Sequence, residues 1–501
     1  MIAITNRIIK QAGVVVTCAV IAACSADVSN PPPLNSGTAS AGDADFTKYV
    51  AIGDSLTAGY ADGALYLLGQ QNSFPAMLAQ QFAQVGGGAF AQPLLNNDLA
   101  AGVDGNLGAL LVDTFGPLIE SRFVLNTETE SPERLQGTAT DNVVGTGLNG
   151  TAFNNMGVPG SKSFHLLAPG YGAIAGLPAT ANPYFTRFAI DEATSSIVGD
   201  AAAQAPSFYT LWIGNNDVLG YATSGGDDSD PITDMATFDG AYAGVIAAMQ
   251  AANAAVQGVL INIPDVSTIP FFTTVPYNAI PLDQATADLL NSDPNTIAYN
   301  EGLQTALAGS VITQEEADAR TITFVAGHNA PVIEDETLTN IGAPLIRQAT
   351  ANDLILLPVS AYLGTEDENS AGATPPAGLP WGLGTPLTDA DVLIPSEVAA
   401  IDTARTAFNA TIKAVADADD NLVYLDAAAL LTQLSESGID YGNGSITSDF
   451  VSGGGFSLDG VHPTARGYAV IANAVVDTIN SGFNANVYKV DPATYPTVFL
   501  K

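Results

Sequence analysis

The chain has 501 residues, of which 47% are hydrophobic and 13% are charged. This content suits a globular protein with one large core or two ordinary ones, and it excludes an intrinsically disordered chain. Because only 14 Lys and Arg residues stand against 51 Asp and Glu, the surface repels nucleic-acid phosphates, and a nucleic-acid partner is not expected.

The N-terminus predicts an export signal. Arg7 and Lys10 precede an apolar run over residues 12–23, which is shorter than the roughly 20 residues of a membrane span. The run ends in the sequence IAAC at residues 21–24, which resembles the lipobox of bacterial lipoproteins. In such proteins the cysteine, here Cys24, is lipidated and becomes the first residue of the mature chain. An ordinary signal peptide cleaved near the same alanines is the alternative, and both interpretations predict an exported protein.

The cysteine content favours the lipidated form. The other cysteine, Cys18, lies inside the predicted signal of residues 1–23, so a mature chain that begins at Cys24 has no internal disulfide. Residues 24–45 are rich in Ser, Pro, Gly and Ala and predict a flexible tether. We therefore expect a bacterial lipoprotein whose membrane partner is reached through lipidated Cys24, at the outer membrane or the cell surface. A soluble periplasmic or secreted protein is the alternative.

The folded part begins near Phe46, and its first element carries a candidate nucleophile. Residues 49–52 form a short apolar run of the kind buried in a parallel sheet, and Gly53 then lets the backbone turn. The next residues can enter a helix, which places Ser55 near unpaired backbone N–H groups that favour an oxyanion. A serine that only caps the helix is the alternative interpretation.

Further along the chain, strands alternate with helices. Residues 73–82 have apolar side chains at helical spacing, whereas residues 86–150 are dense in Gly, Asn and Thr and predict loops. Later segments predict strands at residues 207–213, 258–263 and 422–425, and helices at residues 239–255, 396–416 and 463–479. This alternation predicts parallel βαβ units and an α/β fold.

A long segment, about residues 267–396, interrupts the alternation. It is rich in Pro and Gly but also predicts a helix at residues 298–307 and a strand at residues 321–325. We interpret it as an insertion packed on the α/β core, and its apolar stretches at residues 269–272 and 354–359 are candidates for the wall of a substrate cleft. The predicted parts of the chain are thus the signal at 1–23, the tether at 24–45, a folded domain at 46–485 that contains this insertion, and a C-terminal tail at 486–501.

The loop DGVHP at residues 459–463 predicts a carboxylate paired with a base. On a tight loop, Asp459 can fold back onto the Nδ1–H group of His462, which leaves Nε2 free to accept a proton. A surface ion pair or a capped helix is the alternative interpretation of this loop. The other two histidines, His165 and His328, lack such a carboxylate and are interpreted as structural.

Four short motifs, in this chain order, resemble those of the GDSL, or SGNH, family of serine esterases and lipases. They are IGDSLTAGY at residues 52–60, NNMGVPG at 154–160, GNND at 214–217 and DGVHP at 459–463. The family carries Ser, Gly, Asn and His in this order. The resemblance implies the SGNH-hydrolase fold, a flavodoxin-like, three-layer α/β/α structure with a central parallel sheet of about five strands. The G-x-S-x-G elbow of ordinary α/β-hydrolases is missing.

The resemblance also implies a reaction, the hydrolysis of carboxylic esters. Ser55 would be the nucleophile, His462 the general base and then the general acid, and Asp459 the group that orients His462. No metal or organic cofactor is implied. The substrate partner would be a lipid, a short-chain ester or an acylated polysaccharide.

An oxyanion hole is implied as well. It would consist of the backbone N–H groups of Ser55 and Gly160 and the side-chain amide of Asn216. Gly157 competes with Gly160 for this role, and a plain turn explains either glycine. Each motif follows a predicted strand, and sites in open α/β sheets form at the carboxyl ends of strands.

Three other functions fit parts of this pattern. The first is a carbohydrate acetyl esterase that uses the same site. The second is a metal-dependent phosphoesterase in which Asp54, Asp217, Asp459 and His462 converge, but such sites take several histidines and the chain has only three. The third is a catalytically silent surface lipoprotein that binds glycans or lipids. The acidic loop at residues 225–230 is interpreted as solvated rather than as a cation site.

Overall fold

The computed structural model describes residues 35–99, 101–102, 121–137, 141–142, 146–365, 380–442 and 444–501. The predicted signal and Cys24 lie outside these residues. The chain forms two compact units. We call one the sheet unit (Pro31–Gly220, Pro231–Phe271 and Ala400–Lys501) and the other the inserted unit (Tyr221–Asp230 and Phe272–Ala399).

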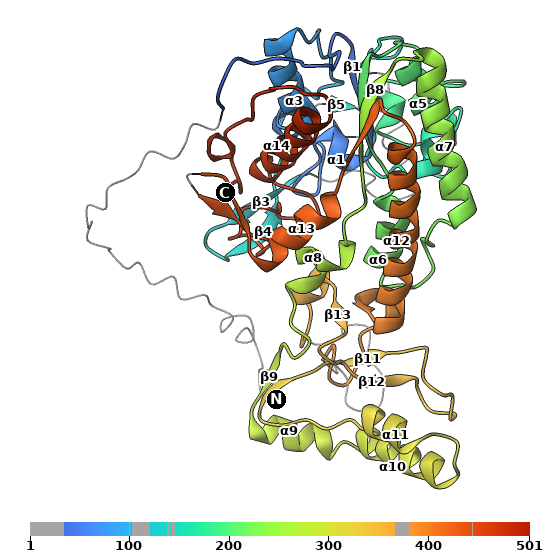
Figure 1. The fold of residues 1–501 in the computed structure, drawn as a ribbon. Helices are drawn as coiled ribbons and strands as arrows, with labels where there is room; N and C mark the ends of the chain where they lie inside the picture. The colour runs from blue at the N-terminus through green and yellow to red at the C-terminus, as the bar shows by residue number, and fades with distance from the viewer. Residues whose placement is uncertain are drawn as a thin grey trace, which may run out of the picture. The chain divides into compact units, whose positions relative to one another are not determined.

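The sheet unit is built on five parallel strands (Figure 1). In spatial order they are β15 (Leu422–Leu425), β8 (Gln257–Ile261), β7 (Phe208–Trp212), β1 (Tyr49–Gly53) and β6 (Asn155–Gly157). Every residue of β1 and β7 is buried, as is typical of strands that helices cover on both faces. The predicted α/β fold with a central parallel sheet of five strands is confirmed.

The strand order places the candidate site. β6 follows β1 in the chain and lies on one side of it, whereas β7 lies on the other side and is followed outward by β8 and β15. This is the flavodoxin-like order, and the direction of winding reverses between β1 and β7. Ligands of open α/β sheets bind at such a reversal, outside the carboxyl ends of the strands. Ser55 follows β1 and Asn216 follows β7, so both residues lie at the reversal.

Helices cover both faces of the sheet (Figure 1). On one face, α3 (Phe74–Phe82) packs against α14 (Ala465–Gly482), and alternate strand residues such as Tyr49 and Phe208 join their core. On the other face lie α5 (Ile197–Ala202), α7 (Met235–Ala252) and α12 (Pro395–Asp417), and Phe238 of α7 stacks on Phe408 of α12 with ring centroids 4.0 Å apart. The sheet unit also contains α1 (Ser55–Ala58), α2 (Leu67–Gln71) and α13 (Ala427–Glu436), while α6 (Asn216–Thr223) and α8 (Pro270–Thr273) each contain residues of both units.

No helix in the described part of the chain has both the length and the apolar character to span a bilayer.

Residues 86–150 do not consist of loops alone. Within their described part, β3 (Phe123–Asn126) pairs with β4 (Ser131–Arg134), and β2 (Ala101–Gly102) pairs with β5 (Asp141–Asn142). The prediction of loops throughout is wrong because these strands are short and β4 carries the sequence SPER, so no alternating apolar pattern marks them.

Two other predictions fail near the end of the chain. The last helix begins at Ala465, with Thr464 as its cap, so Pro463 precedes the helix instead of opening it. The loop at residues 459–463 does not follow a strand of the central sheet directly. After β15 the chain first forms α13 and then the antiparallel pair β16 (Ile439–Asp440) and β17 (Ser445–Ile446).

Residues 35–45 are the described part of the predicted tether, and they lie along the C-terminal segment. The N–H of Ser40 donates to the carbonyl of Asn486 over 3.1 Å, and the N–H of Asn486 donates back over 2.8 Å. The side chain of Asn35 bonds the backbone of Lys489 at two points, over 2.6 and 3.0 Å. These residues are therefore hydrogen-bonded to the C-terminal segment and belong to the sheet unit.

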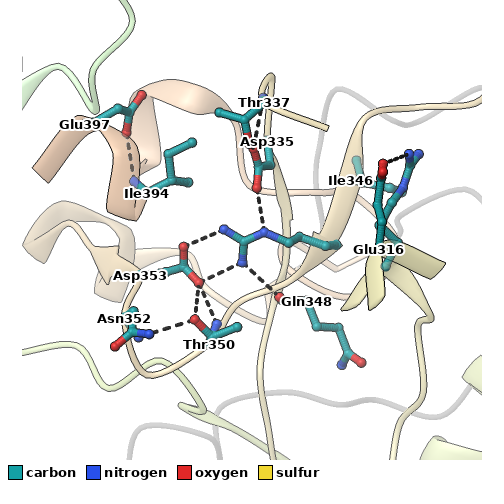
Figure 2. Close-up of polar contacts among 12 residues, drawn as sticks. Glu316, Asp335, Thr337, Ile346, Gln348, Thr350, Asn352, Asp353, Ile394 and Glu397 are labelled. Atoms are coloured by element: carbon teal, nitrogen blue, oxygen red, sulfur yellow. Dashed lines mark hydrogen bonds and ion pairs between the residues drawn. The ribbon is translucent and has the colours of Figure 1, made fainter. Parts of the chain in front are cut away.

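The inserted unit has a core of its own, formed by α9 (Gln284–Asn291), α10 (Pro294–Ala308) and α11 (Gln314–Arg320). Its strand pairs are β9 (Ile280–Leu282) with β10 (Gly327–Asn329), β11 (Val332–Glu334) with β12 (Ile346–Gln348), and β13 (Leu354–Ile355) with β14 (Val392–Leu393). The inserted unit also contains a buried cluster of three charged residues. The guanidinium of Arg347 lies between Asp335, 2.6 Å away, and Asp353, 2.7 Å away (Figure 2).

Residues 321–325 form no strand in this unit. The N–H of Ile322 donates to the side chain of Asn300 over 3.0 Å, and that side chain donates to the carbonyl of Ile322 over 2.9 Å. Asn291 bonds the backbone of Phe324 in the same way. The predicted strand is wrong because two asparagine amides take the place of a neighbouring strand, while Ile322 and Phe324 still point into the core.

Candidate active site

The turn after β1 leaves the hydroxyl of Ser55 available. Asp54, and not Ser55, caps the short helix α1, because its carboxylate accepts the N–H of Leu56 over 2.9 Å. The other oxygen of Asp54 accepts the side-chain amide of Asn215 over 2.9 Å, which ties the turn to the end of β7. A Cβ atom at Gly53 would lie 2.3 Å from the carbonyl oxygen of Trp212, so only glycine fits at this turn.

Ser55, His462 and Asp459 lie in one hydrogen-bonded line. The Nε2 atom of His462 is 2.9 Å from the Oγ atom of Ser55, and Nδ1 is 2.9 Å from Oδ2 of Asp459. The pair of bonds fits a histidine that is protonated on Nδ1 and free to accept a proton on Nε2. These atoms come from the two ends of the chain, 407 residues apart, and the fold brings them together.

A tight loop sets the angle between Asp459 and His462. Oδ1 of Asp459 accepts the backbone N–H groups of Val461 and His462 over 2.9 and 2.8 Å. The N–H of Ser457 donates to the carbonyl of His462 over 2.8 Å, and Gly460 turns the chain with φ of +72°. The predicted fold-back of a carboxylate three residues before a histidine is what the structure contains.

Asp459 is ionised at neutral pH. Burial alone would raise its pKa, but the neighbouring His462 and the hydrogen bonds to the carboxylate outweigh burial and lower the pKa to about 2. The N–H of Gly63 also donates to Oδ2 of Asp459 over 2.8 Å. The ring of Tyr60 lies against the imidazole of His462, with centroids 4.6 Å apart, and limits how far that ring can turn.

The motifs of Ser55, Gly160 and Asn216 each offer one available hydrogen-bond donor. The backbone N–H groups of Ser55 and Gly160 have no hydrogen-bond partner among the described residues. The side-chain nitrogen of Asn216 donates one proton to the carbonyl of Ser161 over 3.0 Å, which fixes the amide and leaves its second proton available. Gly160 has φ of +79° and is exposed at the turn after β6.

Gly157 differs from Gly160 in both respects. Its N–H donates to the side chain of Asn155 over 3.0 Å, so it is not available to a ligand. A Cβ atom at Gly157 would lie 2.3 Å from the backbone nitrogen of Ala58, so this glycine permits close packing of β6 on α1. The geometry therefore favours Gly160 as the donor of the NNMGVPG motif.

The carboxylates that a metal site would need do not converge here. Asp54 bonds Leu56 and Asn215, as above, whereas Asp217 accepts the backbone N–H and the hydroxyl of Ser163 over 2.8 and 2.6 Å. Burial raises the pKa of both carboxyls, that of Asp54 to about 6. Asp217 thus ties the GNND motif to the segment after Gly160.

One group of three carboxylates in the described residues could hold a cation, and it lies in the inserted unit. The carboxylate oxygens of Glu336, Asp389 and Glu397 are within 4.8 Å of one another. Glu397 also accepts the N–H of Ile394 over 2.7 Å (Figure 2). Burial, with the repulsion of Glu336 and Asp389, raises the pKa of Glu397 to about 8.

A second carboxylate supports the loop of Asp459, and the sequence patterns did not reveal it. Asp62 accepts the N–H of Leu458 over 3.1 Å and the hydroxyl of Tyr66 over 2.7 Å. Its own N–H donates to the hydroxyl of Ser457, which donates to Asp459 over 3.1 Å. The only local signal is an ADG sequence that predicts a turn, in which Asp62 has a positive φ.

The other two histidines have different surroundings. Nδ1 of His165 accepts the N–H of Lys162 over 3.0 Å, and its ring stacks on Tyr171 at 4.6 Å. His328 is exposed in β10 of the inserted unit. Neither residue joins the line of Ser55 and His462.

An apolar pocket opens beside Ser55 and His462. It measures about 900 Å³, counting its open mouth. Its walls come from the carboxyl ends of β7 and β15, from α13, from the β16 and β17 pair and from the start of α14, all within the sheet unit. Of the apolar stretches predicted to line a cleft, only Ile269 contributes, and residues 354–359 do not.

A family model described as GDSL-like Lipase/Acylhydrolase matches residues 49–343, which is more than half of the chain. The matched segment contains Ser55, Gly160 and Asn216 and ends before Asp459 and His462. Comparison with curated proteins and with solved structures gives no match. The match, the flavodoxin-like strand order and the four motifs agree with one another. The chain belongs to the GDSL-like lipase/acylhydrolase family.

Proposed function

We propose that this esterase-type hydrolase is an exported, lipid-anchored serine enzyme that cleaves carboxylic esters through an acyl-enzyme. The observation that carries the proposal is the line from Ser55 Oγ through both nitrogens of His462 to Asp459, with 2.9 Å at each step. A histidine held at this distance from a serine hydroxyl is within reach for proton transfer.

The first half of the reaction forms an ester with the enzyme. Oγ of Ser55 attacks the carbonyl carbon while its proton passes to Nε2 of His462. The C–O bond to the alcohol then breaks, and His462 gives the proton to the departing oxygen. Asp459 keeps its negative charge throughout and stabilises the imidazolium that forms in between, which its low pKa favours.

The second half returns the enzyme to its starting state. Water loses a proton to Nε2 of His462 and attacks the acyl carbon, the acid leaves, and Oγ of Ser55 recovers the proton. In both halves a negative oxygen develops on the substrate. The N–H groups of Ser55 and Gly160 and the free proton of Asn216 would hold it, and preorganised donors of this kind are the largest single contribution in many acyl transfers.

Turnover of p-nitrophenyl acetate by the purified protein tests the proposal. Ser55→Ala is expected to abolish turnover without changing the unfolding midpoint, while Thr432→Ala, at an exposed position of α13, serves as the matched control. Activity that persists in Ser55→Ala, or that a chelator removes from the unaltered protein, would contradict the serine mechanism.

The anchor and the location rest on the sequence at residues 21–24. We expect radiolabelled palmitate to enter the unaltered protein in bacterial cells, and Cys24→Ser to abolish the label and release the protein from the outer-membrane fraction. Release without loss of the label, or a label that survives in Cys24→Ser, would argue against lipidation of Cys24.

A further inference from the structure

One face of α13 lines the pocket beside the candidate nucleophile. The lining residues of this helix are Ala427, Leu430, Leu431 and Leu434. Their spacing of three, one and three residues is that of a single helical face. Gln433, which lies off this face, is exposed. The helix therefore presents its apolar side to the pocket.

The other wall residues that follow α13 in the chain are apolar too. Ile439 comes from β16, Ile446 from β17 and Val470 from α14, and Phe456 lies between these elements in the chain. The polar side chains that touch the pocket are Ser55, Asn215, Asn216 and His462, and all four belong to the candidate active site. Among the described residues, no charged side chain and no side-chain hydrogen-bond donor lines the α13 end, so that end offers nothing to a sugar hydroxyl.

The sheet order sets the length of the pocket. α13 follows β15, whereas Ser55 follows β1, and these two strands are three positions apart in the sheet. At about 4.8 Å for each step, the two ends of the pocket are roughly 14 Å apart, which is about the reach of an extended chain of ten to twelve carbons. Leu434 and Phe456 of the pocket wall are buried, with 8% and 6% of their surface exposed.

We propose that this pocket holds the acyl chain of a medium- or long-chain ester, and that α13 with β16 and β17 sets the preferred acyl length. The inference rests on the proposed acylation of Ser55. The acyl group stays covalently attached while the alcohol departs, so the sheltered apolar pocket suits the acyl chain and the alcohol needs the route to solvent. The substrates are thus lipid-like esters rather than acetylated sugars.

The size of the preference follows from burial of methylene groups. Each methylene that moves from water into an apolar pocket raises kcat/KM by up to roughly fourfold. Lengthening the acyl group from butyrate to octanoate adds four of them, so octanoate is expected to exceed butyrate by about 50-fold or more. Leu434 lines the pocket and lies against Gly455, where a Cβ atom would lie 3.2 Å from its side chain, so a larger residue at 434 would take up part of the pocket's volume.

The test compares p-nitrophenyl esters of acetate, butyrate, octanoate and dodecanoate in monomeric solution. In Leu434→Trp the ratio of kcat/KM for dodecanoate to that for acetate is expected to fall at least tenfold, and in Leu434→Ala the optimum is expected to move to longer chains. Gln433→Trp, on the exposed face of α13, is the matched control and should keep the ratios of the unaltered protein. Unfolding midpoints of all four proteins show whether each variant is folded.

A second series fixes the acyl group as acetate and lengthens the alcohol. The proposal requires that kcat/KM stays nearly constant as the alcohol is lengthened. A strong dependence on the alcohol, or no dependence on the acyl chain in a protein that turns over acetate, overturns it while leaving the serine mechanism intact. If the unaltered protein does not turn over any of these esters, that result would instead count against the proposed function.

Discussion

Replacing Asp459 by Asn tests how the carboxylate serves His462. Oδ1 of Asp459 accepts the N–H groups of Val461 and His462, and Oδ2 accepts those of Gly63 and of the His462 ring. Every partner is a donor. Whichever way the new amide turns in Asp459→Asn, its NH₂ group meets at least one backbone donor at about 2.8 to 2.9 Å, as in the native loop.

Two consequences follow for the variant. With the amide NH₂ toward His462, the ring nitrogen Nδ1 becomes the acceptor, the proton moves to Nε2, and Nε2 can no longer accept the proton of Ser55. We expect kcat/KM to fall by about 10³- to 10⁴-fold, or ~4 to 5.5 kcal/mol in the barrier. The backbone N–H that faces the new NH₂ group loses its acceptor, which lowers the free energy of unfolding by about 1 to 3 kcal/mol.

The assay measures kcat/KM on p-nitrophenyl butyrate and the urea midpoint for both proteins at pH 7.5. Asp440→Asn, an exposed carboxylate in β16, is the matched control and should change neither value. An Asp459→Asn protein that stays folded and keeps its rate within tenfold of the unaltered protein would refute the role given to the carboxylate.

Three further changes test other parts of the account. Asn216→Ala should keep the unfolding midpoint but lower kcat about 10²-fold, because one oxyanion donor is lost, and full kcat in this variant would exclude the assignment. Burial raises the pKa of Asp62 to about 6, so the folded protein binds this proton more tightly than the unfolded chain, and stability falls as pH rises from about 4 through 6. In Asp62→Asn, the decrease in the free energy of urea unfolding over this pH range should therefore be smaller by up to about 3 kcal/mol, and a pH profile equal to that of the unaltered protein would contradict this role. Arg347→Ala leaves two buried carboxylates unpaired and should cost about 3 to 5 kcal/mol in urea unfolding. Lys413→Ala, which breaks an exposed ion pair, should cost less than about 1 kcal/mol, and equal effects of the two changes would rule out the buried pair as a support of the inserted unit.

The central sheet and the nucleophile turn were predictable because their signals are local. The apolar run before Gly53 predicts a buried strand. In the loop DGVHP the spacing predicts the contact, because a carboxylate three residues before a histidine can reach back to the ring. The positions of Ser55 and Asn216 then follow from the parallel sheet, whose strands end at one edge, whereas the loop of His462 reaches Ser55 only after α13 and the pair of β16 and β17.

What remained hidden depends on contacts between distant segments. In the sequence Asp62 resembles an ordinary turn residue, and only the structure shows that its carboxylate accepts the N–H of Leu458. The choice between Gly157 and Gly160 required knowing that Asn155 occupies the N–H of the former. The wall of the pocket comes from α13, whose apolar side could equally have packed into the core, so its periodicity alone does not reveal a ligand site.

The most direct test of the central claim is to treat the purified protein with a fluorophosphonate and to map the adduct by peptide mass spectrometry. We predict one adduct, on the peptide that contains Ser55, formed in step with the loss of esterase activity and absent from Ser55→Ala. An adduct on another serine, or activity that survives complete modification of Ser55, would contradict the serine mechanism.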